Sequence, residues 1–283
     1  MNLVTVCGHN TTMLYHMLRH YQPVVENFYV NIYANYEDDP IIDEVNSICD
    51  ELNITPHKIW IEKPFNWNRV TDIYNETISS KPDEWWIVAD DDELQVYSKP
   101  IEEIVQECEE NGYEYVRGGF IDRIGEDGDF PKITKESNVW KEMPNAGFFR
   151  YPLSRAEANK VTLLKGNHKL KSGQHFIEFK DGSTSWGEWY KSLCYPIEKN
   201  FTQVHHFKWD YSVLQRLKEV SSSKLHEAFS HEYKKMLSAI EYLDYKLDLN
   251  EREFMFERVE SPDYKQYRKW KALTKKILKI RDL

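Results

Sequence analysis

The sequence of 283 residues lacks the features that define several protein classes. It has no run of about 18 apolar residues, so we expect no membrane-spanning helix. Its net charge of -10 disfavours nucleic-acid binding through a general basic face. Its four cysteines include no Cys-x-x-Cys pair, which argues against a zinc cluster or a disulfide framework and favours reduced thiols.

The amino terminus, Met1-Asn2-Leu3-Val4-Thr5-Val6, has neither the basic start nor the length of a signal peptide. No internal repeat or low-complexity linker is present. We therefore expect a cytoplasmic protein. Aromatic residues, by contrast, are abundant, with 9 Trp, 18 Tyr and 13 Phe. They either form the core or line a site for flat or sugar-like ligands.

Strand-like and helix-like segments alternate four times in the first 95 residues. This alternation predicts a parallel sheet wrapped by helices, in which ligands bind beyond the carboxyl ends of the strands. Four loops that follow strands should therefore meet at one crevice. The predicted strands are 3–7, 28–33, 58–62 and 85–89, and the predicted helices are 13–21, 40–52 and 69–79.

The alternation ends after a predicted helix from about Ser98 to Asn111 and a strand at 113–121. Residues 130–200 hold short apolar runs and turn formers, which predict antiparallel strands and loops over the sheet. A last short strand is predicted at 204–209, and helices from Ser212 onward.

The carboxyl-terminal segment 264–283 carries eight Lys or Arg against one Asp. An apolar stripe of Trp270, Leu273, Ile277 and Ile280 predicts a basic amphipathic helix. Two interpretations stay open. The helix docks on the acidic remainder of the chain, or it contacts an anionic membrane surface as a peripheral anchor.

Four consecutive acids, Asp90-Asp91-Asp92-Glu93, follow the apolar run 85–89 directly. In an extended segment, Asp90 and Asp92 would face one side and Asp91 and Glu93 the other. Two carboxylates on one side suit a hard divalent cation that takes its other ligands from water and phosphate oxygens. The alternative is a solvated acidic turn.

Two further groups carry side chains suited to the same chemistry. In His205-His206-Phe207-Lys208-Trp209, an imidazole can add a metal ligand and the lysine can neutralise a phosphate oxygen. In 165–169 and 173–175, glycines and polar residues, including His168 and His175, either bind hydroxyl groups or form a hairpin loop.

Several of these segments together resemble a known family. The acids 90–93, Asn75 on the preceding helix, Gly119-Phe120-Ile121-Asp122-Arg123, Asp127-Gly128 and His206-Phe207-Lys208-Trp209 are similar to segments of GT-A fold glycosyltransferases, particularly the family 2-like group. The resemblance covers roughly residues 1–218. It departs at the first loop, where the usual Asn-Glu is replaced by Gly8-His9-Asn10.

This resemblance implies an α/β GT-A (Rossmann-like) nucleotide-diphospho-sugar transferase fold, with a mixed sheet flanked by helices and a C-terminal helical extension. The transferase domain would be 1–218, with a nucleotide-binding half at 1–95 and an acceptor-side half at 113–210. The helical extension would be 219–283. The implied activity is sugar transfer from a UDP- or GDP-sugar to a hydroxyl of a glycan or other acceptor, with Mn²⁺ or Mg²⁺ as cofactor. We expect inversion of the anomeric configuration, and retention stays open as the alternative.

The resemblance also implies roles for individual residues, and loop position and chemistry supply the other candidates. The metal would be bound by Asp92, by Asp90, which could instead bind the ribose, and by His206, with His205 as the fallback. Donor contacts are expected from Asn10, Asp39, Asn68, Asp72, Asp91 and Lys208, with Trp67 or Tyr33 stacking on the base. Acceptor contacts are expected from Trp186, Trp189, His168 and His175. The general base of an inverting enzyme would be Glu188 or Asp122.

Other classes fit the sequence less well. A non-catalytic carbohydrate- or nucleotide-binding module on the same fold would not need the metal ligands. A metal-dependent phosphohydrolase usually carries its Asp-x-Asp after the first strand rather than the fourth. A nucleotidyltransferase would normally have a glycine-rich, basic loop after the first strand, and Gly8-His9-Asn10-Thr11 is not such a loop.

Overall fold

A computed structural model describes most of the chain in two compact units. Unit 1 comprises Met1–Gly119 and Asn159–Val204, and unit 2 comprises Phe120–Ala158 and His205–Leu283. The residues described are 1–149 except 9 and 64, then 159–179, 182, 193–196, 199, 202–222, 227–242, 244–247, 249 and 256–258. Both units are discontinuous in sequence, and residue 218, the expected domain boundary, lies within α6 (Ser212–Ser222).

Unit 1 begins with the alternation of strands and helices that the sequence predicts. Its four parallel strands lie in the order β3–β2–β1–β4, and each is joined to the next along the chain by one helix. The strands are β1 (Asn2–Cys7), β2 (Asn27–Ala34), β3 (Lys58–Ile61) and β4 (Trp85–Val88), and the helices are α1 (Leu14–Tyr21), α2 (Pro40–Glu51) and α3 (Trp67–Ile78).

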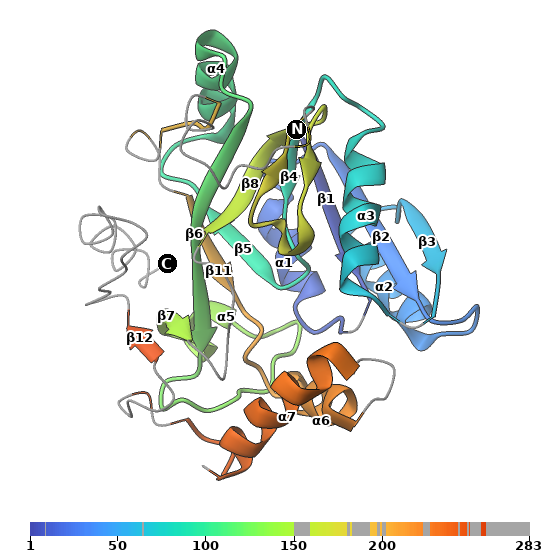
Figure 1. Ribbon diagram of the computed structural model, residues 1–283, viewed down its shortest axis with the longest axis vertical. Helices are drawn as coiled ribbons and strands as arrows, with labels where there is room; N and C mark the ends of the chain where they lie inside the picture. The colour runs from blue at the N-terminus through green and yellow to red at the C-terminus, as the bar shows by residue number, and fades with distance from the viewer. Residues whose placement is uncertain are drawn as a thin grey trace. The chain divides into compact units, whose positions relative to one another are not determined.

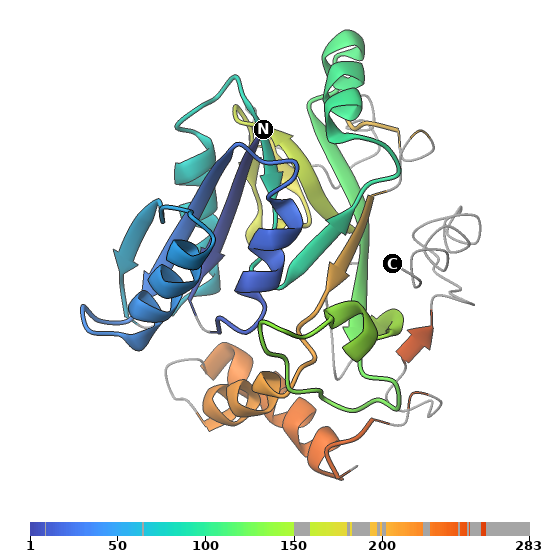
Figure 2. The same ribbon diagram turned by 180° about the vertical axis from the view of Figure 1, so that it is seen from behind.

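The strand order determines which face each helix covers. From β1 the chain moves outward to β2 and β3, then returns to add β4 on the other side of β1. Because crossover connections are right-handed, this reversal places α3 on the opposite face from α1 and α2. Figures 1 and 2 show this arrangement, with α3 in front in the first view and α1 and α2 in front in the second. The reversal lies between β1 and β4, where ligands bind in sheets of this kind.

Antiparallel strands extend the sheet beyond β4, so the prediction of a mixed α/β sheet flanked by helices is confirmed. β8 (Asn159–Lys165) pairs with β4, and residues 115–119 of β6 (Tyr115–Ile124) pair with β8. The hairpin of β9 (Lys169–Leu170) and β10 (Ile177–Glu178) forms a separate two-stranded sheet. Two further elements of this region are α4 (Ile101–Asn111) and β5 (Glu93–Val96).

Local sequence explains where the helices of unit 1 begin and end. Asp39 caps α2 by accepting a hydrogen bond from the Ile41 backbone N–H, with Pro40 at the first helical position. Asn66 caps α3 in the same way. Gly112 ends α4 in the left-handed conformation at φ 72°, which glycine adopts without strain.

Unit 2 contains the remainder of β6, which pairs with β7 (Asn145–Phe149), and β7 in turn pairs with β12 (Phe256–Arg258). Its helices are α5 (Val139–Glu142), α6 and α7 (Glu227–Tyr242), which confirms the helical character expected after Ser212. The strand predicted at 204–209 is observed as β11 (Thr202–His206). It ends earlier than predicted, and the side chains of Phe207 and Trp209 are buried beyond the strand.

The structure bears on two expectations, that the cysteines are reduced thiols and that no helix spans a membrane. All four cysteines are buried and none forms a disulfide. Burial raises the pKa of Cys49 to about 11 and that of Cys108 to about 12. Within the residues described, no helix has the length and apolarity needed to cross a bilayer. The basic amphipathic helix predicted at 264–283 lies outside the described residues.

Candidate functional site

The four acids form a turn between two short strands. β4 ends at Val88, Asp91 and Asp92 occupy the turn, and β5 begins at Glu93. The Glu93 backbone N–H donates to the Asp90 carbonyl over 3.1 Å. We call residues 90–93 the acidic turn. Because the chain reverses here, the side-chain alternation expected of an extended segment does not apply to these residues.

The acidic turn lies at the carboxyl end of β1, next to the reversal in strand order. Cys7 is the last residue of β1, and its thiol donates to the Asn10 carbonyl over 3.6 Å. Burial, followed by the nearby Asp91 charge, raises the pKa of this thiol well above its usual value. Asp91, predicted to contact the donor, therefore lies near the end of β1.

A buried lysine supplies the cation that four adjacent acids require. The Lys160 ammonium lies 2.7 Å from Asp90 Oδ2, 2.9 Å from Glu93 Oε1 and 2.9 Å from Gln174 Oε1. Its side chain is only 4% exposed. Burial alone would lower the pKa of Lys160, but the carboxylates of Asp90 and Glu93 more than offset this and raise it. Lys160 is thus charged at neutral pH.

The second oxygen of Asp90 is also bound by the protein. The Tyr74 hydroxyl lies 2.9 Å from Asp90 Oδ1 and 2.9 Å from the Ala89 carbonyl. Glu93 Oε2 accepts the Asp90 backbone N–H at 3.2 Å. Lys160 and Tyr74 therefore fix the direction of the Asp90 carboxylate, whereas Glu93 holds the backbone N–H of the same residue. No sequence pattern marked Lys160 or Tyr74 for this role.

Two of the predicted donor residues hold their own loops. Asn10 Oδ1 accepts hydrogen bonds from the backbone N–H and the hydroxyl of Thr12. Asp39 caps α2 and also accepts the Asn35 backbone N–H at 2.9 Å. Tyr33, a candidate for base stacking, is only 2% exposed and packs on Phe65. This stacking prediction is wrong for Tyr33, since its ring is covered by the protein.

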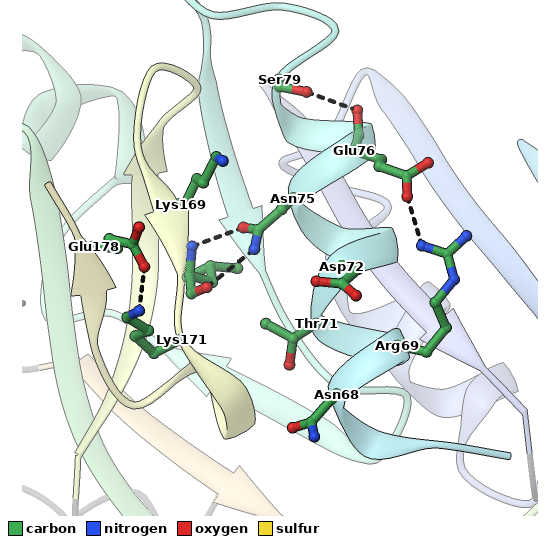
Figure 3. Close-up of a pocket in the computed structure, with 11 residues that line it drawn as sticks. Asn68, Arg69, Thr71, Asp72, Asn75, Glu76, Ser79, Lys169, Lys171 and Glu178 are labelled. Atoms are coloured by element: carbon green, nitrogen blue, oxygen red, sulfur yellow. Dashed lines mark hydrogen bonds and ion pairs between the residues drawn. The ribbon is translucent and has the colours of Figure 1, made fainter. Parts of the chain in front are cut away.

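Two more of the predicted donor residues, Asn68 and Asp72, line a pocket of about 610 Å³ between α3 and the β9–β10 hairpin. Figure 3 shows Asn68, Thr71, Asp72 and Asn75 along one side of α3, with Lys169 and Lys171 on the strand opposite. The complete lining is Asn68, Arg69, Thr71, Asp72, Asn75, Glu76, Ser79, Lys169, Leu170, Lys171 and Glu178.

Charges in this pocket are partly paired. Lys171 forms an ion pair with Glu178, and Arg69 pairs with Glu76 and Glu62. Asp72 and Lys169 are both exposed and form no ion pair with another described residue. Hydroxyls, amides, the ion pairs and the charges of Asp72 and Lys169 all line the same space. The pocket therefore suits a polar, hydroxyl-rich ligand more than an apolar one.

Asn75, part of the family resemblance, joins α3 to the hairpin. Its Nδ2 donates to the Leu170 carbonyl at 3.0 Å, and its Oδ1 accepts the Leu170 backbone N–H at 2.7 Å. The amide thus occupies both backbone groups of one strand residue. Both residues line the pocket, and this contact attaches the hairpin to α3.

The two histidines predicted to contact an acceptor are engaged within unit 1. His168 is 6% exposed and its Nε2 lies 2.5 Å from Glu114 Oε2. His175 Nδ1 lies 2.5 Å from the Asn159 carbonyl, and Asn159 Nδ2 donates back to the His175 carbonyl at 2.6 Å. These contacts give both histidines a structural function, and their role toward an acceptor stays a prediction.

In unit 2, the buried carboxylate of Asp122 is the centre of a hydrogen-bonded cluster. Its Oδ1 lies 2.8 Å from His206 Nδ1 and accepts the Trp209 indole N–H at 2.9 Å. Its Oδ2 accepts the Phe149 backbone N–H at 3.2 Å. A carboxylate bonded to Nδ1 fixes the orientation of an imidazole, as it does for many metal-binding histidines.

His205 and Lys208, on either side of His206 and Phe207 in the sequence, both contact aromatic rings. His205 is 1% exposed and meets the Trp140 ring edge-on at 4.9 Å. Lys208 lies over the rings of Trp209 and Tyr233, at 5.2 and 5.8 Å from their centroids.

The predicted Glu188, Trp186 and Trp189 lie outside the described residues. Asp90 and Asp92 belong to unit 1, and the two histidines belong to unit 2.

Among the residues that the structure describes, no three His, Cys, Asp or Glu side chains gather into a metal-binding group. In the acidic turn the reason is visible, since Lys160 occupies the side of Asp90 and Glu93 that a cage of protein ligands would use. A cation at this turn would need most of its ligands from elsewhere.

Comparison with known proteins finds no matching family model and no matching curated protein. Residues 1–349 of S. aureus TarS in complex with UDP share 9% identity over 85% of this chain and 72% of TarS 1–349, at a TM-score of 0.34. This chain spans only 43% of a longer TarS structure. A Bacillus anthracis protein crystallised with sucrose and described as a glucose-1-phosphate thymidylyltransferase shares 11% identity over 82% of this chain and 98% of its own, at a TM-score of 0.37. TM-scores below 0.5 do not establish a shared activity.

Proposed function

We propose that this chain is a metal-dependent glycosyltransferase, which moves a sugar from a UDP- or GDP-linked donor to a hydroxyl group of a glycan. The observation that carries the proposal is the position of the acidic turn. It follows β4 at the carboxyl end of the parallel strands, where the strand order reverses between β1 and β4. Parallel α/β sheets bind their ligands at this position.

The residues present fit a divalent cation that shares its ligands with a substrate. Mg²⁺ and Mn²⁺ prefer oxygen ligands, and Mg²⁺ is usually bound by one or two carboxylates together with substrate phosphates and water. Asp92, half-buried in the turn, would supply the carboxylate. Asp90, with both oxygens bound by Tyr74 and Lys160, is better suited to contact the donor through its fixed geometry. His206 as a further ligand stays a prediction.

A diphosphate leaving group requires positive charge beside it. When bound, the cation would stabilise the charge that develops on the diphosphate as the sugar leaves. Lys208 is the candidate cation from the chain itself. Of the two predicted bases, Asp122 accepts three hydrogen bonds and is only 4% exposed, which suits orienting His206 more than removing a proton. Glu188 therefore stays as the predicted base.

A thermal-unfolding panel with UDP, GDP, CMP and dTDP, each with and without Mn²⁺, tests the proposal. One diphosphate at a hundred times its Kd should stabilise the folded protein by about 2.7 kcal/mol, and only with the metal. For a chain of 283 residues we expect a Tm rise of roughly 4–5 °C. If no nucleotide raises the Tm with Mn²⁺, the proposal is wrong. Binding without sugar release from the matching nucleotide sugars would favour a non-catalytic binding module instead.

The pocket beside α3 gives a narrower prediction about the donor. If Asn68 and Asp72 contact the donor as predicted, Asp72→Ala should weaken Mn²⁺-dependent nucleotide binding about five- to tenfold, or about 1–1.4 kcal/mol. This is less than the roughly 1.5–3 kcal/mol of a hydrogen bond to a charged group, because Asp72 is exposed to water. Asp72 is exposed, so the Tm without ligand should not change. Isothermal titration calorimetry measures the Kd. Asp83→Ala, another exposed acid of unit 1, is the control. Equal affinity of both variants would place the nucleotide away from this pocket.

A further inference from the structure

The structure assigns Lys160 as a positioning residue, a built-in counter-ion that holds the acidic turn in its binding geometry before any metal is bound. The assignment rests on the proposed function only for what the turn binds. The conformation of the turn itself is fixed by contacts within unit 1, which are those of Lys160 with Asp90, Glu93 and Gln174.

The register of the sheet places Lys160 beside the turn. β8 runs antiparallel to β4, with Trp85 opposite Lys165, Trp86 opposite Leu164 and Ile87 opposite Leu163. Continuing this register by three residues sets Lys160 opposite Asp90. A single lysine at the start of β8 therefore meets the acids although 70 residues separate it from Asp90. Lys160 is itself fixed from the other side, since β8 also pairs with β6.

Burial makes the ammonium group necessary to the turn. The side chains of Lys160 and Glu93 are 4% and 2% exposed, and Asp90 is 32% exposed. Two carboxylates this close would repel each other strongly where water is excluded. The lysine turns this repulsion into two ion pairs, so the turn does not depend on an external cation to form. A metal then adds to a site that is already shaped.

A residue in an unusual backbone conformation completes the cluster. Gln174 has φ 54°, in the left-handed region that non-glycine residues rarely adopt, and it is 4% exposed. Its side-chain oxygen accepts from Lys160. The adjacent His175 is bonded in both directions to Asn159, the residue before Lys160. Such conformations persist where the surroundings fix them, and they occur often at functional sites.

The role of Lys160 can be separated from its effect on folding. Lys160→Met alone leaves two acids without their cation and should fold poorly. Lys160→Met with Glu93→Gln removes one positive and one negative charge, and this double variant should recover a cooperative thermal transition. Lys165→Met is the matched control, since Lys165 lies on the same strand but pairs with the exposed Glu109.

Two measurements on the full chain test the inference. Hydrogen exchange in EDTA should show the backbone amides of Asp90 and Glu93 protected in the natural chain and in Lys165→Met, and exchanging at least tenfold faster in the double variant. The Kd for UDP or GDP with Mn²⁺, whichever binds the natural chain, should rise at least tenfold in the double variant alone.

The possible failures are distinct. If the natural chain protects these amides only when Mn²⁺ is added, Lys160 does not preform the turn and the inference is wrong. If the double variant folds and binds the nucleotide as tightly as the natural chain, Lys160 has no positioning role. If the natural chain binds no nucleotide but protects the turn in EDTA, the proposed function fails while the preformed turn stands.

Discussion

Replacing Asp92 by alanine should lower metal-dependent sugar transfer by about a thousandfold or more, which corresponds to about 4 kcal/mol of transition-state stabilisation. The variant would lose the carboxylate proposed to hold the cation, and with it the charge that stabilises the leaving diphosphate. The fold should persist, because the ion pairs that hold the turn belong to Asp90 and Glu93. Release of UDP or GDP from the matching nucleotide sugar, with Mn²⁺ titrated, measures the loss.

Asp83→Ala is a suitable control for this variant. It removes the same charge from an exposed position just before β4 and leaves the turn unchanged. We expect turnover within twofold of the natural chain. Asp92→Ala enzyme with near-normal turnover and an unchanged dependence on Mn²⁺ would contradict the assignment of Asp92 as the metal ligand.

Replacing Asp122 by alanine should destabilise unit 2 by about 3–5 kcal/mol. The change leaves the Trp209 indole N–H, the Phe149 backbone N–H and the His206 ring nitrogen without their shared acceptor in a buried position. Urea unfolding followed by tryptophan fluorescence should show the loss as a lower transition midpoint, since Trp209 itself reports on the cluster.

Asp127→Ala provides the comparison in the same unit. Its side chain is 74% exposed, and its contact is an ion pair with Lys246, whose side chain is 54% exposed. Exposed pairs of this kind contribute little, so the midpoint should stay within the error of the measurement. A loss of less than 1 kcal/mol in Asp122→Ala would show that the cluster is not a stabilising centre. Asp122 would then be open again as the general base.

The sequence predicted what local chemistry determines. Alternating apolar segments set the first four strands and three helices, and the caps at Asp39 and Gly112 are local because capping depends on one or two residues. The acids 90–93 were recognisable as a candidate site because four adjacent charges are costly without a partner. Their position at the carboxyl end of the fourth strand then followed from the alternation, whereas the reversal of strand order came from the structure.

What the sequence did not reveal depends on contacts between distant residues. Lys160 is an ordinary lysine in an apolar run until the register of β8 sets it opposite Asp90. The short strand β5 was hidden because its first residue, Glu93, was counted among the acids of a loop. Tyr33 was a reasonable stacking candidate at the end of β2, yet Phe65 covers it. The two-unit division was equally hidden, because each unit is built from separated segments.

The amide of Asn75 has a consequence for sequence divergence. This side-chain amide bonds only to the backbone N–H and carbonyl of Leu170, as a neighbouring strand would. It therefore occupies a strand edge that could otherwise recruit a strand from another molecule. Neither bond depends on which side chain residue 170 carries. Aspartate could not replace Asn75, because it cannot donate, and glutamine would set the amide one methylene too far. The hairpin beside the pocket can thus change its side chains, and with them the polarity of the pocket lining, while its attachment to α3 is kept.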